Sequence, residues 1–315
     1  MAAQTLAGIG IRPAEKTEGT QMLKHRFVFS TLLTALVAVV SVFSAASALA
    51  DSAVWKVSKG SDYFYLGGSA HLLPASDFPL PAPYQRAFAD SDVLVLETEL
   101  PKTPQAQQEF ISMLQYSDGR TLQQVLSADV YRQLADYLTA NGANLNDLQR
   151  FTPGFILMLA TQIESQKIGI AGEGVDAYFQ QQAENAEKPI WFLEALSYQA
   201  QVLAELGQGD EDDFVVRMLA EVPEAGQVLQ DTIAAWRSGD LATIQRVVNE
   251  PMLEDDPASY QALFTQRNDN WMRKLLGYFR NAQREFVLVG AGHLAGDDGL
   301  IAQLKAQGFV VQQLP

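Results

Sequence analysis

Two histidines stand in matching local sequences far apart in the chain. His71 and His293 each follow an apolar stretch that leads into Gly-x-x-His-Leu, and the sequence contains only one other histidine. The glycines that open the two motifs, Gly68 and Gly290, allow the backbone to turn sharply or to approach another group closely. In open α/β sheets, ligands bind just beyond the carboxyl ends of the strands. We therefore expect both histidines to lie at a ligand site, with Gly68 and Gly290 as structural turns in front of them.

Two glutamates also follow short apolar runs. Glu97 comes directly after residues 93–96, and Glu194 comes directly after residues 190–193. Taken alone, each is simply the solvated end of a strand, because burying a charge is costly unless it is paired or bound to a metal. If the four strands lie side by side, two imidazoles and two carboxylates converge. Such a donor set suits Zn, Mn, Co or Fe.

A basic and an amide side chain open an amphipathic helix at residues 267–280. Arg267 and Asn268 have a simple structural interpretation, in which the helix start is exposed and Asn268 or Asp269 caps it. The functional interpretation places a fixed cation and an amide donor near negative charge that develops on a bound substrate. Both interpretations stay open from the sequence alone.

The elements that must position these residues are few strands and many helices. Apolar or β-favouring runs predict six strands, the first two joined as a hairpin. They are residues 54–57, 63–66, 93–96, 190–193, 286–289 and 309–311. Helical periodicity predicts mainly helical segments over about 103–186 and 197–281, with breaks at Pro223 and at the acidic loop 250–257. Strands near both ends with helices between them indicate one α/β domain over residues 51–315, with a large helical insertion.

Composition excludes several classes of protein. The chain has 315 residues, of which 48% are hydrophobic and 19% charged, so it is not a disordered chain. Its formal net charge of −15 argues against a nucleic-acid-binding protein, which needs a basic patch to displace counterions from phosphates. The absence of cysteine excludes disulfides, thiolate metal sites, iron–sulfur clusters and cysteine nucleophiles.

The N-terminal segment has the order of a secretory signal peptide. Lys24 and Arg26 precede an apolar run over residues 27–43, and Ala48 and Ala50 stand at the positions −3 and −1 that signal peptidase prefers. Met22 is a natural start, which makes residues 1–21 an extension in front of it. We expect residues 1–50 to be removed, giving an exported protein, periplasmic or secreted, with no stable membrane span. The alternative is an uncleaved membrane anchor, since the run is near spanning length.

Short motifs along the chain resemble the TraB/GumN family. The resemblance runs from about residue 53 to 314 and rests on Trp55-Lys-Val, Gly68-Ser-Ala-His71, Asp92-Val-Leu-Val-Leu-Glu97, Gly174-Val-Asp176-Ala-Tyr-Phe179, Lys188-Pro-Ile-Trp-Phe-Leu-Glu194 with Gln199 downstream, Arg267-Asn268-x-x-Trp271 and Val289-Gly-Ala-Gly-His293-Leu-Ala-Gly296. Val175 stands where the family often has isoleucine, and Ala195 stands where threonine is common. The second departure removes a hydroxyl near the expected site.

The resemblance implies a fold and an activity. It implies an α/β fold whose central sheet is built from two βα halves, with the Gly-x-x-His strand ends on its N- and C-terminal sides. The family is related to the TIKI proteins and, more distantly, to erythromycin esterases and ChaN-like haem-binding proteins. For TIKI relatives it implies metal-dependent peptidase activity supported by manganese or cobalt, whereas many bacterial members have no established activity.

From the residues and the resemblance together, we expect an exported metal-dependent hydrolase of the peptidase type. His71, His293 and one or both of Glu97 and Glu194 bind a divalent metal that activates water. The carboxylate that is not a ligand acts as general base, and Arg267 stabilises the oxyanion. Two further residues, Asn268 and Gln199, are expected to bind substrate.

Two other classes stay open. A non-catalytic protein would use the two histidines to hold haem or a metal, and a metal-independent esterase would use one histidine as the base. A serine triad is disfavoured, because Gly68-Ser69-Ala70 lacks the second glycine of the Gly-x-Ser-x-Gly elbow. The expected partner is a peptide or a small molecule, with neutral or basic peptides preferred by the acidic chain and no role for nucleic acid.

Overall fold

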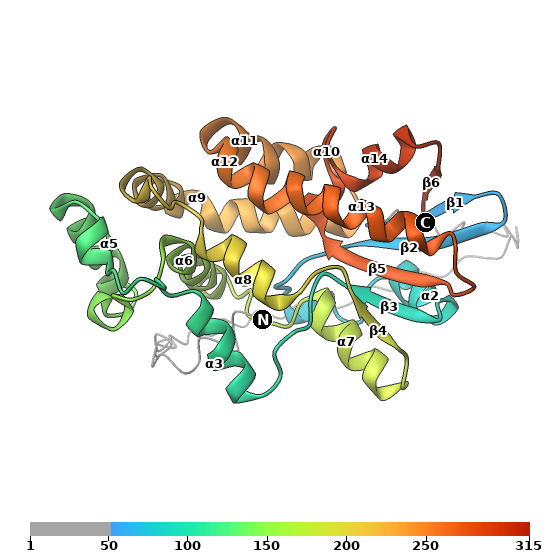
Figure 1. Ribbon diagram of the computed structural model, residues 1–315, viewed down its shortest axis with the longest axis horizontal. Coiled ribbons are helices and arrows are strands. Elements are labelled where there is room, and N and C mark those ends of the chain that lie inside the picture. The colour runs from blue at the N-terminus through green and yellow to red at the C-terminus, as the bar shows by residue number, and fades with distance from the viewer. Residues whose placement is uncertain (1–51) are drawn as a thin grey trace, which may run out of the picture. The chain divides into compact units, whose positions relative to one another are not determined.

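A six-stranded mixed β-sheet organises the computed structural model, which describes residues 52–315 (Figure 1). The strands lie in the order β4-β3-β5-β2-β1-β6. Their bounds are β1 Val54–Lys59, β2 Asp62–Ser69, β3 Val93–Leu96, β4 Ile190–Phe192, β5 Glu285–Gly290 and β6 Val310–Gln313. The α/β class, the N-terminal hairpin and the six predicted strands are confirmed. The predicted leader and its cleavage site lie outside the described residues.

Four neighbouring strands of the sheet are parallel. β2 pairs with β5, β5 with β3 and β3 with β4 in parallel, whereas β1 is antiparallel to both β2 and β6. The carboxyl ends of the four parallel strands therefore meet at one edge of the sheet. The residues that follow those ends are His71 after β2, Glu97 after β3, Glu194 after β4 and His293 after β5.

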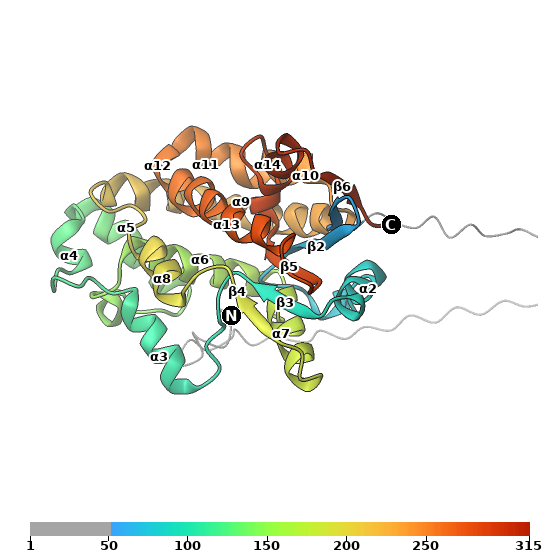
Figure 2. The ribbon, with the colours of Figure 1, turned by 45° about the vertical axis from the view of Figure 1, so that its right-hand side comes forward.

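The central strands are buried on both faces. All four residues of β3 are buried, as are residues 285–289 of β5, which is typical of parallel strands covered by helices on two sides. Figures 1 and 2 show α13 and α14 on one side of the sheet and α2 and α7 on the other. Fully buried side chains from both sides, among them Trp271 of α13 and Phe179 of α7, belong to one hydrophobic core with the strands.

Thirteen α-helices surround the sheet or extend from it in the described part of the chain. They are α2 Ala82–Asp90, α3 Pro104–Met113, α4 Leu122–Val125, α5 Ala128–Ala140, α6 Pro153–Lys167, α7 Val175–Asn185, α8 Leu196–Ala204, α9 Glu211–Ser238, α10 Leu241–Ile244, α11 Glu250–Asp255, α12 Pro257–Tyr260, α13 Gln266–Tyr278 and α14 Leu300–Ala306. Helices α3 to α6, α8 and the first half of α9 pack around a second hydrophobic core. Within residues 52–315, no helix combines the length and the apolar character that a bilayer crossing requires.

Helix α9 contributes to both cores and continues without a break past Pro223. The predicted break at Pro223 is therefore wrong. A proline inside a helix removes a backbone hydrogen bond and costs about 3 kcal/mol or more. However, α9 buries Phe214 in the second core and Trp236 in the first, so packing at both ends favours one continuous helix. The predicted acidic loop at 250–257 is also wrong over most of its length, because α11 occupies it.

Candidate functional site

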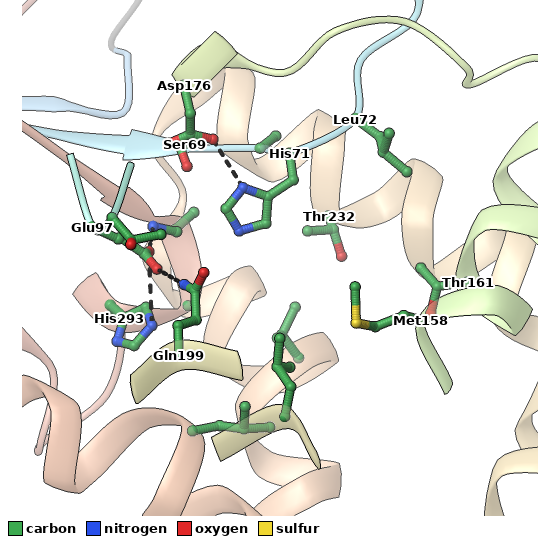
Figure 3. Close-up of a pocket in the computed structure, with 18 of the residues that line it drawn as sticks. Ser69, His71, Leu72, Glu97, Met158, Thr161, Asp176, Gln199, Thr232 and His293 are labelled. Carbon is green, nitrogen blue, oxygen red and sulfur yellow. Dashed lines mark hydrogen bonds and ion pairs between the residues drawn. The ribbon is translucent and has the colours of Figure 1, made fainter. Parts of the chain in front are cut away.

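His71 is oriented by a carboxylate at the start of α7. Its Nδ1 lies 2.8 Å from Oδ2 of Asp176, in the first turn of that helix (Figure 3). The start of α7 contacts the loop that carries His71, because the backbone N–H of Val175 donates a hydrogen bond to the carbonyl of Ala70 at 3.0 Å. A Cβ on Gly174 would lie 2.5 Å from backbone atoms of Ala70 and His71, so only glycine permits this close approach.

One nitrogen of His71 stays available to a ligand. The side chain is 62% exposed, and Nδ1 is bonded to Asp176, whereas Nε2 has no hydrogen-bond partner within residues 52–315. Desolvation by the surrounding protein disfavours the charged form of His71. The charge and the hydrogen bond of Asp176 outweigh this effect and raise the pKa of His71 above its usual value. Asp176 thus has the orienting role that carboxylates have beside histidines in many hydrolytic and metal sites.

Glu97 is buried and held by three donors. Its Oε1 accepts a hydrogen bond from the backbone N–H of Gly290 at 2.6 Å. Its Oε2 accepts hydrogen bonds from Nη2 of Arg267 at 2.6 Å and from Nε2 of Gln199 at 3.1 Å. Burial alone would raise the pKa of Glu97, but the charge of Arg267 and the hydrogen bond from the Gly290 backbone lower it to about 2. Glu97 is therefore ionised.

His293 is buried and neutral. It lies in a short 3-10 helix, Ala291–Leu294, directly after β5. Arg267 Nη1 lies 3.0 Å from its Nε2 and can only donate, so Nε2 accepts and Nδ1 carries the proton, which it donates to Asn268 Oδ1 at 2.7 Å. Burial and the charge of Arg267 lower the pKa of His293 to about 3. Asn268 thus fixes the tautomer of His293.

Arg267 joins these groups to the second glutamate. Arg267 is 5% exposed. Its guanidinium donates to Glu97 and, through Nη2 at 2.7 Å and Nε at 3.1 Å, to Oε1 of Glu194. The other oxygen of Glu194 accepts the indole N–H of Trp271 at 2.9 Å. The guanidinium also lies over the Trp271 ring, 4.6 Å from its centroid. Both oxygens of Glu194 are therefore occupied within the protein.

The ends of three strands bring His71, Glu97 and His293 around one small space. A Cβ built on Gly290 would lie 3.4 Å from Glu97 Oε1, 3.6 Å from His293 Cδ2 and 3.7 Å from His71 Nε2. Glu97 Oε1 and His293 Nε2 are 3.9 Å apart. Glycine at position 290 therefore leaves room among the three groups that any other side chain would fill.

This space opens into a cavity of about 470 Å³. His71, Glu97, Gln199 and His293 lie at one side of it, as Figure 3 shows, and Arg267 and Asp176 also line it. Glu194 and Asn268 are not among the lining residues; they contact Arg267 and His293 from behind. The structure thus places five of the seven predicted ligand, catalytic and substrate-binding residues at the cavity, and each of the other two in contact with one of those five.

Asp176 is the site residue that sequence reasoning missed. It belongs to the Gly174-Val-Asp176 motif, yet it is 105 positions away from His71, and no local spacing connects the two. The available signals were the acidic residue in the first turn of a helix and the glycine before it.

The donor types fit a divalent metal, but one side chain competes for them. Among residues 52–315, no group of three or more His, Cys, Asp or Glu side chains is arranged to hold a metal ion. Arg267 hydrogen-bonds two of the donor groups, His293 through Nε2 and Glu97 through Oε2. Nitrogen and oxygen donors nevertheless face one space, and the carboxylates of Glu97, Glu194 and Asp176 outnumber the single guanidinium. Surplus negative charge beside two imidazoles suits a divalent cation.

Comparison with known proteins gives a family and distant relatives. Residues 53–313 match the model of the TraB/PrgY/gumN family. Metalloprotease TIKI2 of Danio rerio is 23% identical over 84% of this chain and 61% of its own length. Metalloprotease TIKI1 of Xenopus tropicalis is 23% identical over 84% of this chain and 62% of its own, and TIKI2 of the same organism is 24% identical over 80% and 58%. The chain thus spans about three fifths of the length of these relatives. No solved structure matches it.

Proposed function

The chain belongs to the TraB/PrgY/gumN family, and on that premise we propose that it is a metal-dependent hydrolase of the peptidase type. In this proposal His71, Glu97 and His293 hold a divalent metal such as manganese or cobalt. The observation that carries it is the convergence of these three side chains, from three different strand ends, around the space beside Gly290. The likeness to metalloproteases supports the same reaction class.

Each remaining polar residue has a role that its contacts suggest. When bound, a divalent metal lowers the pKa of water toward neutrality and polarises a carbonyl. Asp176 orients His71 through Nδ1, and Asn268 does the same for His293. If Nε2 of His293 were a ligand, Arg267 would have to release it, and Nη1 of Arg267 would then be free to donate to negative charge that develops on the substrate.

The two glutamates take different roles in this proposal. We assign ligation to Glu97, whose Oε1 borders the space beside Gly290. Both oxygens of Glu194 are engaged by Arg267 and Trp271, so we assign it to holding the guanidinium in place rather than to proton transfer. Gln199 donates to Glu97 and lines the cavity, where it contacts substrate.

The direct test is hydrolysis of peptides with and without metal. The purified protein is incubated with a mixture of neutral and basic peptides after treatment with a chelator, and again after addition of manganese or cobalt. Mass spectrometry should detect cleavage only after metal is restored. Cleavage that is equally fast in the chelator would overturn the metal-dependent mechanism.

A metal-independent hydrolase is the second candidate, and a specific observation favours it. The Asp176–His71 pair already has the geometry of an oriented general base, with a raised pKa and a free Nε2 at the cavity. In that mechanism, activity survives the chelator and falls by about 10²-fold or more in Asp176→Asn, the usual range for a general base. In the metal-dependent mechanism, the same Asp176→Asn variant also binds manganese about 10–100-fold more weakly, the usual effect of losing a group that orients a ligand.

We also propose that the protein acts outside the cytoplasm, as a periplasmic or secreted enzyme. The sequence of residues 22–51 supports this, because its basic, apolar and small-residue regions follow the order of a cleaved signal peptide.

A further inference from the structure

The cavity is polar on one side and apolar on the other. In Figure 3, His71, Glu97, Gln199 and His293 lie opposite Met158 and Leu72. Much of the apolar wall is contributed by α6, α8 and α9. Its members include Leu157, Met158, Val202, Leu203, Leu229 and Ile233. Thr161 and Thr232 of the same helices also line the cavity, and their hydroxyls donate to backbone carbonyls of their own helices. A ligand whose reacting group reaches the histidines therefore places its neighbouring atoms against hydrocarbon.

A buried amide without partners interrupts this wall. Gln162 of α6 lines the cavity and is 2% exposed, and neither its amide nitrogen nor its amide oxygen has a hydrogen-bond partner among the described residues. Leaving both atoms of a buried amide unpaired is unfavourable. A peptide group offers one donor and one acceptor, which are the two partners that this amide lacks.

We propose that the cavity binds a peptide segment with an apolar side chain next to the bond that reacts. The side chain packs against the wall around Met158, and a peptide group of the same segment pairs with Gln162. This inference rests on the proposed function for the position of the reacting bond, and it narrows the substrate class to apolar peptides. A charged side chain would lose its hydration at this wall, because none of the cavity-lining residues of α6, α8 and α9 carries an opposite charge.

Binding is measured without catalysis, so that the two proposals can fail separately. The probes are acetylated tripeptide amides Gly-X-Gly, in which X is alanine, aminobutyrate, norvaline, norleucine or aspartate. Calorimetric titration in a chelator gives the affinity of the full-length protein for each. Each methylene from alanine to norleucine should raise the affinity roughly fourfold, the value for complete burial of a methylene, and aspartate should bind more weakly than alanine. Equal affinities along the series would overturn the inference.

A pair of methionine variants tests whether the apolar side chain of the peptide packs against the wall around Met158. Met158 is half-buried at the cavity, whereas Met113 of α3 is 43% exposed and does not line it. Met158→Lys should lower the affinity for the norleucine peptide about tenfold or more, because a charge replaces apolar contact, and Met113→Lys should leave it unchanged. Equal effects of the two variants would contradict the assignment of the wall.

Replacement of Gln162 separates recognition from structure. Gln162→Leu removes an unpaired buried amide, so its thermal midpoint should stay the same or rise, while its affinity for the norleucine peptide should fall roughly five- to tenfold. Unchanged affinity would overturn the role of Gln162. If the affinity series holds but no peptide is cleaved with metal, the proposed enzyme activity fails and the binding inference stands. If peptides are cleaved with metal regardless of their side chains, the proposed enzyme activity stands and the inference about apolar side chains fails.

Discussion

Arg267 is the residue on which the electrostatics of the site depend. It is the counter-ion of both Glu97 and Glu194, and it occupies the nitrogen of His293 that a metal would need. Removal of one partner from a buried ion pair costs about 3–5 kcal/mol, because the remaining charge is left uncompensated. Removal of Arg267 would also free His293 Nε2, a ligand in the proposed metal site. Arg267 and that metal would then be alternative cations beside Glu97.

The first prediction follows from this competition. Arg267→Met should lower the free energy of unfolding of the metal-free protein by about 3–5 kcal/mol, since two buried carboxylates lose their counter-ion. Added manganese should restore part of that loss and stabilise the variant more than it stabilises the wild type. Urea unfolding with and without manganese measures both effects. The control is Arg273→Met, an exposed arginine of the same helix, which should have little effect. A variant destabilised equally at all manganese concentrations would argue against a shared site.

The second prediction concerns the loss of folding stability in acid. The folded pKa of His293, about 3, lies below the usual value near 6.5. The unfolded chain therefore binds a proton at this position that the folded chain rejects, so stability is lost as the pH falls from about 6.5 toward 3. The largest slope from one such group is about 1.4 kcal/mol per pH unit.

Urea unfolding in a chelator between pH 7 and 5 tests this dependence. His293→Gln, which cannot titrate at this position, should lose less stability than the wild type on acidification across that interval. Glu97 acts at lower pH, because its folded pKa of about 2 gives a contribution that is present above about pH 4.5 and lost below it. Identical slopes for wild type and variant would show that His293 does not titrate as the structure implies.

At the scale of elements, the strands were predictable and their connections to the helices were not. β3 and β5 are continuous apolar runs, so their positions follow from the sequence. The docking of α7 on the His71 loop depends on contacts between positions about a hundred residues apart, which no local pattern contains. For the same reason, the sequence identified Asn268 and Glu194 as site residues without indicating that they act through His293 and Arg267.

The third prediction tests the docking of α7. A Cβ on Gly174 would meet backbone atoms of Ala70 and His71 at 2.5 Å, which cannot be relieved by turning a side chain. Gly174→Ala should therefore displace the helix start, weaken the Asp176–His71 bond and destabilise the protein by about 1–3 kcal/mol, the usual cost of overpacking. Gly277→Ala is the control, because nothing lies within 4 Å of its added Cβ, and alanine in a helix is favoured over glycine by about 1 kcal/mol. The prediction is wrong if both variants change stability in the same direction.

At the scale of the molecule, the cavity lies where two hydrophobic cores meet. Phe110 belongs to the helical core and Trp236 to the core around the sheet, and both line the cavity. Helix α9 contributes to both cores, so it fixes the apolar wall relative to the histidines. The sequence predicted a helical insertion in an α/β chain, but the cavity between them depends on long-range packing and could not be inferred.

The fourth prediction concerns export. The order of residues 22–51 predicts cleavage after Ala50, so the mature protein should begin at or within a few residues of Asp51. Mass spectrometry of the protein recovered from outside the cytoplasm measures this terminus. Recovery of an intact leader in the membrane fraction would instead identify the apolar run as an anchor.

The proposed metal site is tested most directly by titrating the purified, chelator-treated protein with manganese and measuring binding by calorimetry and by the metal content after dialysis. We predict one bound manganese per chain, and we predict that His71→Ala and His293→Ala each remove most of the binding while unfolding curves show them folded. The double variant should be little worse than either single variant, because ligands of one ion act as a unit. Absence of manganese binding by a wild-type protein that still cleaves peptides in the chelator would contradict the proposed metal site and favour the Asp176–His71 mechanism.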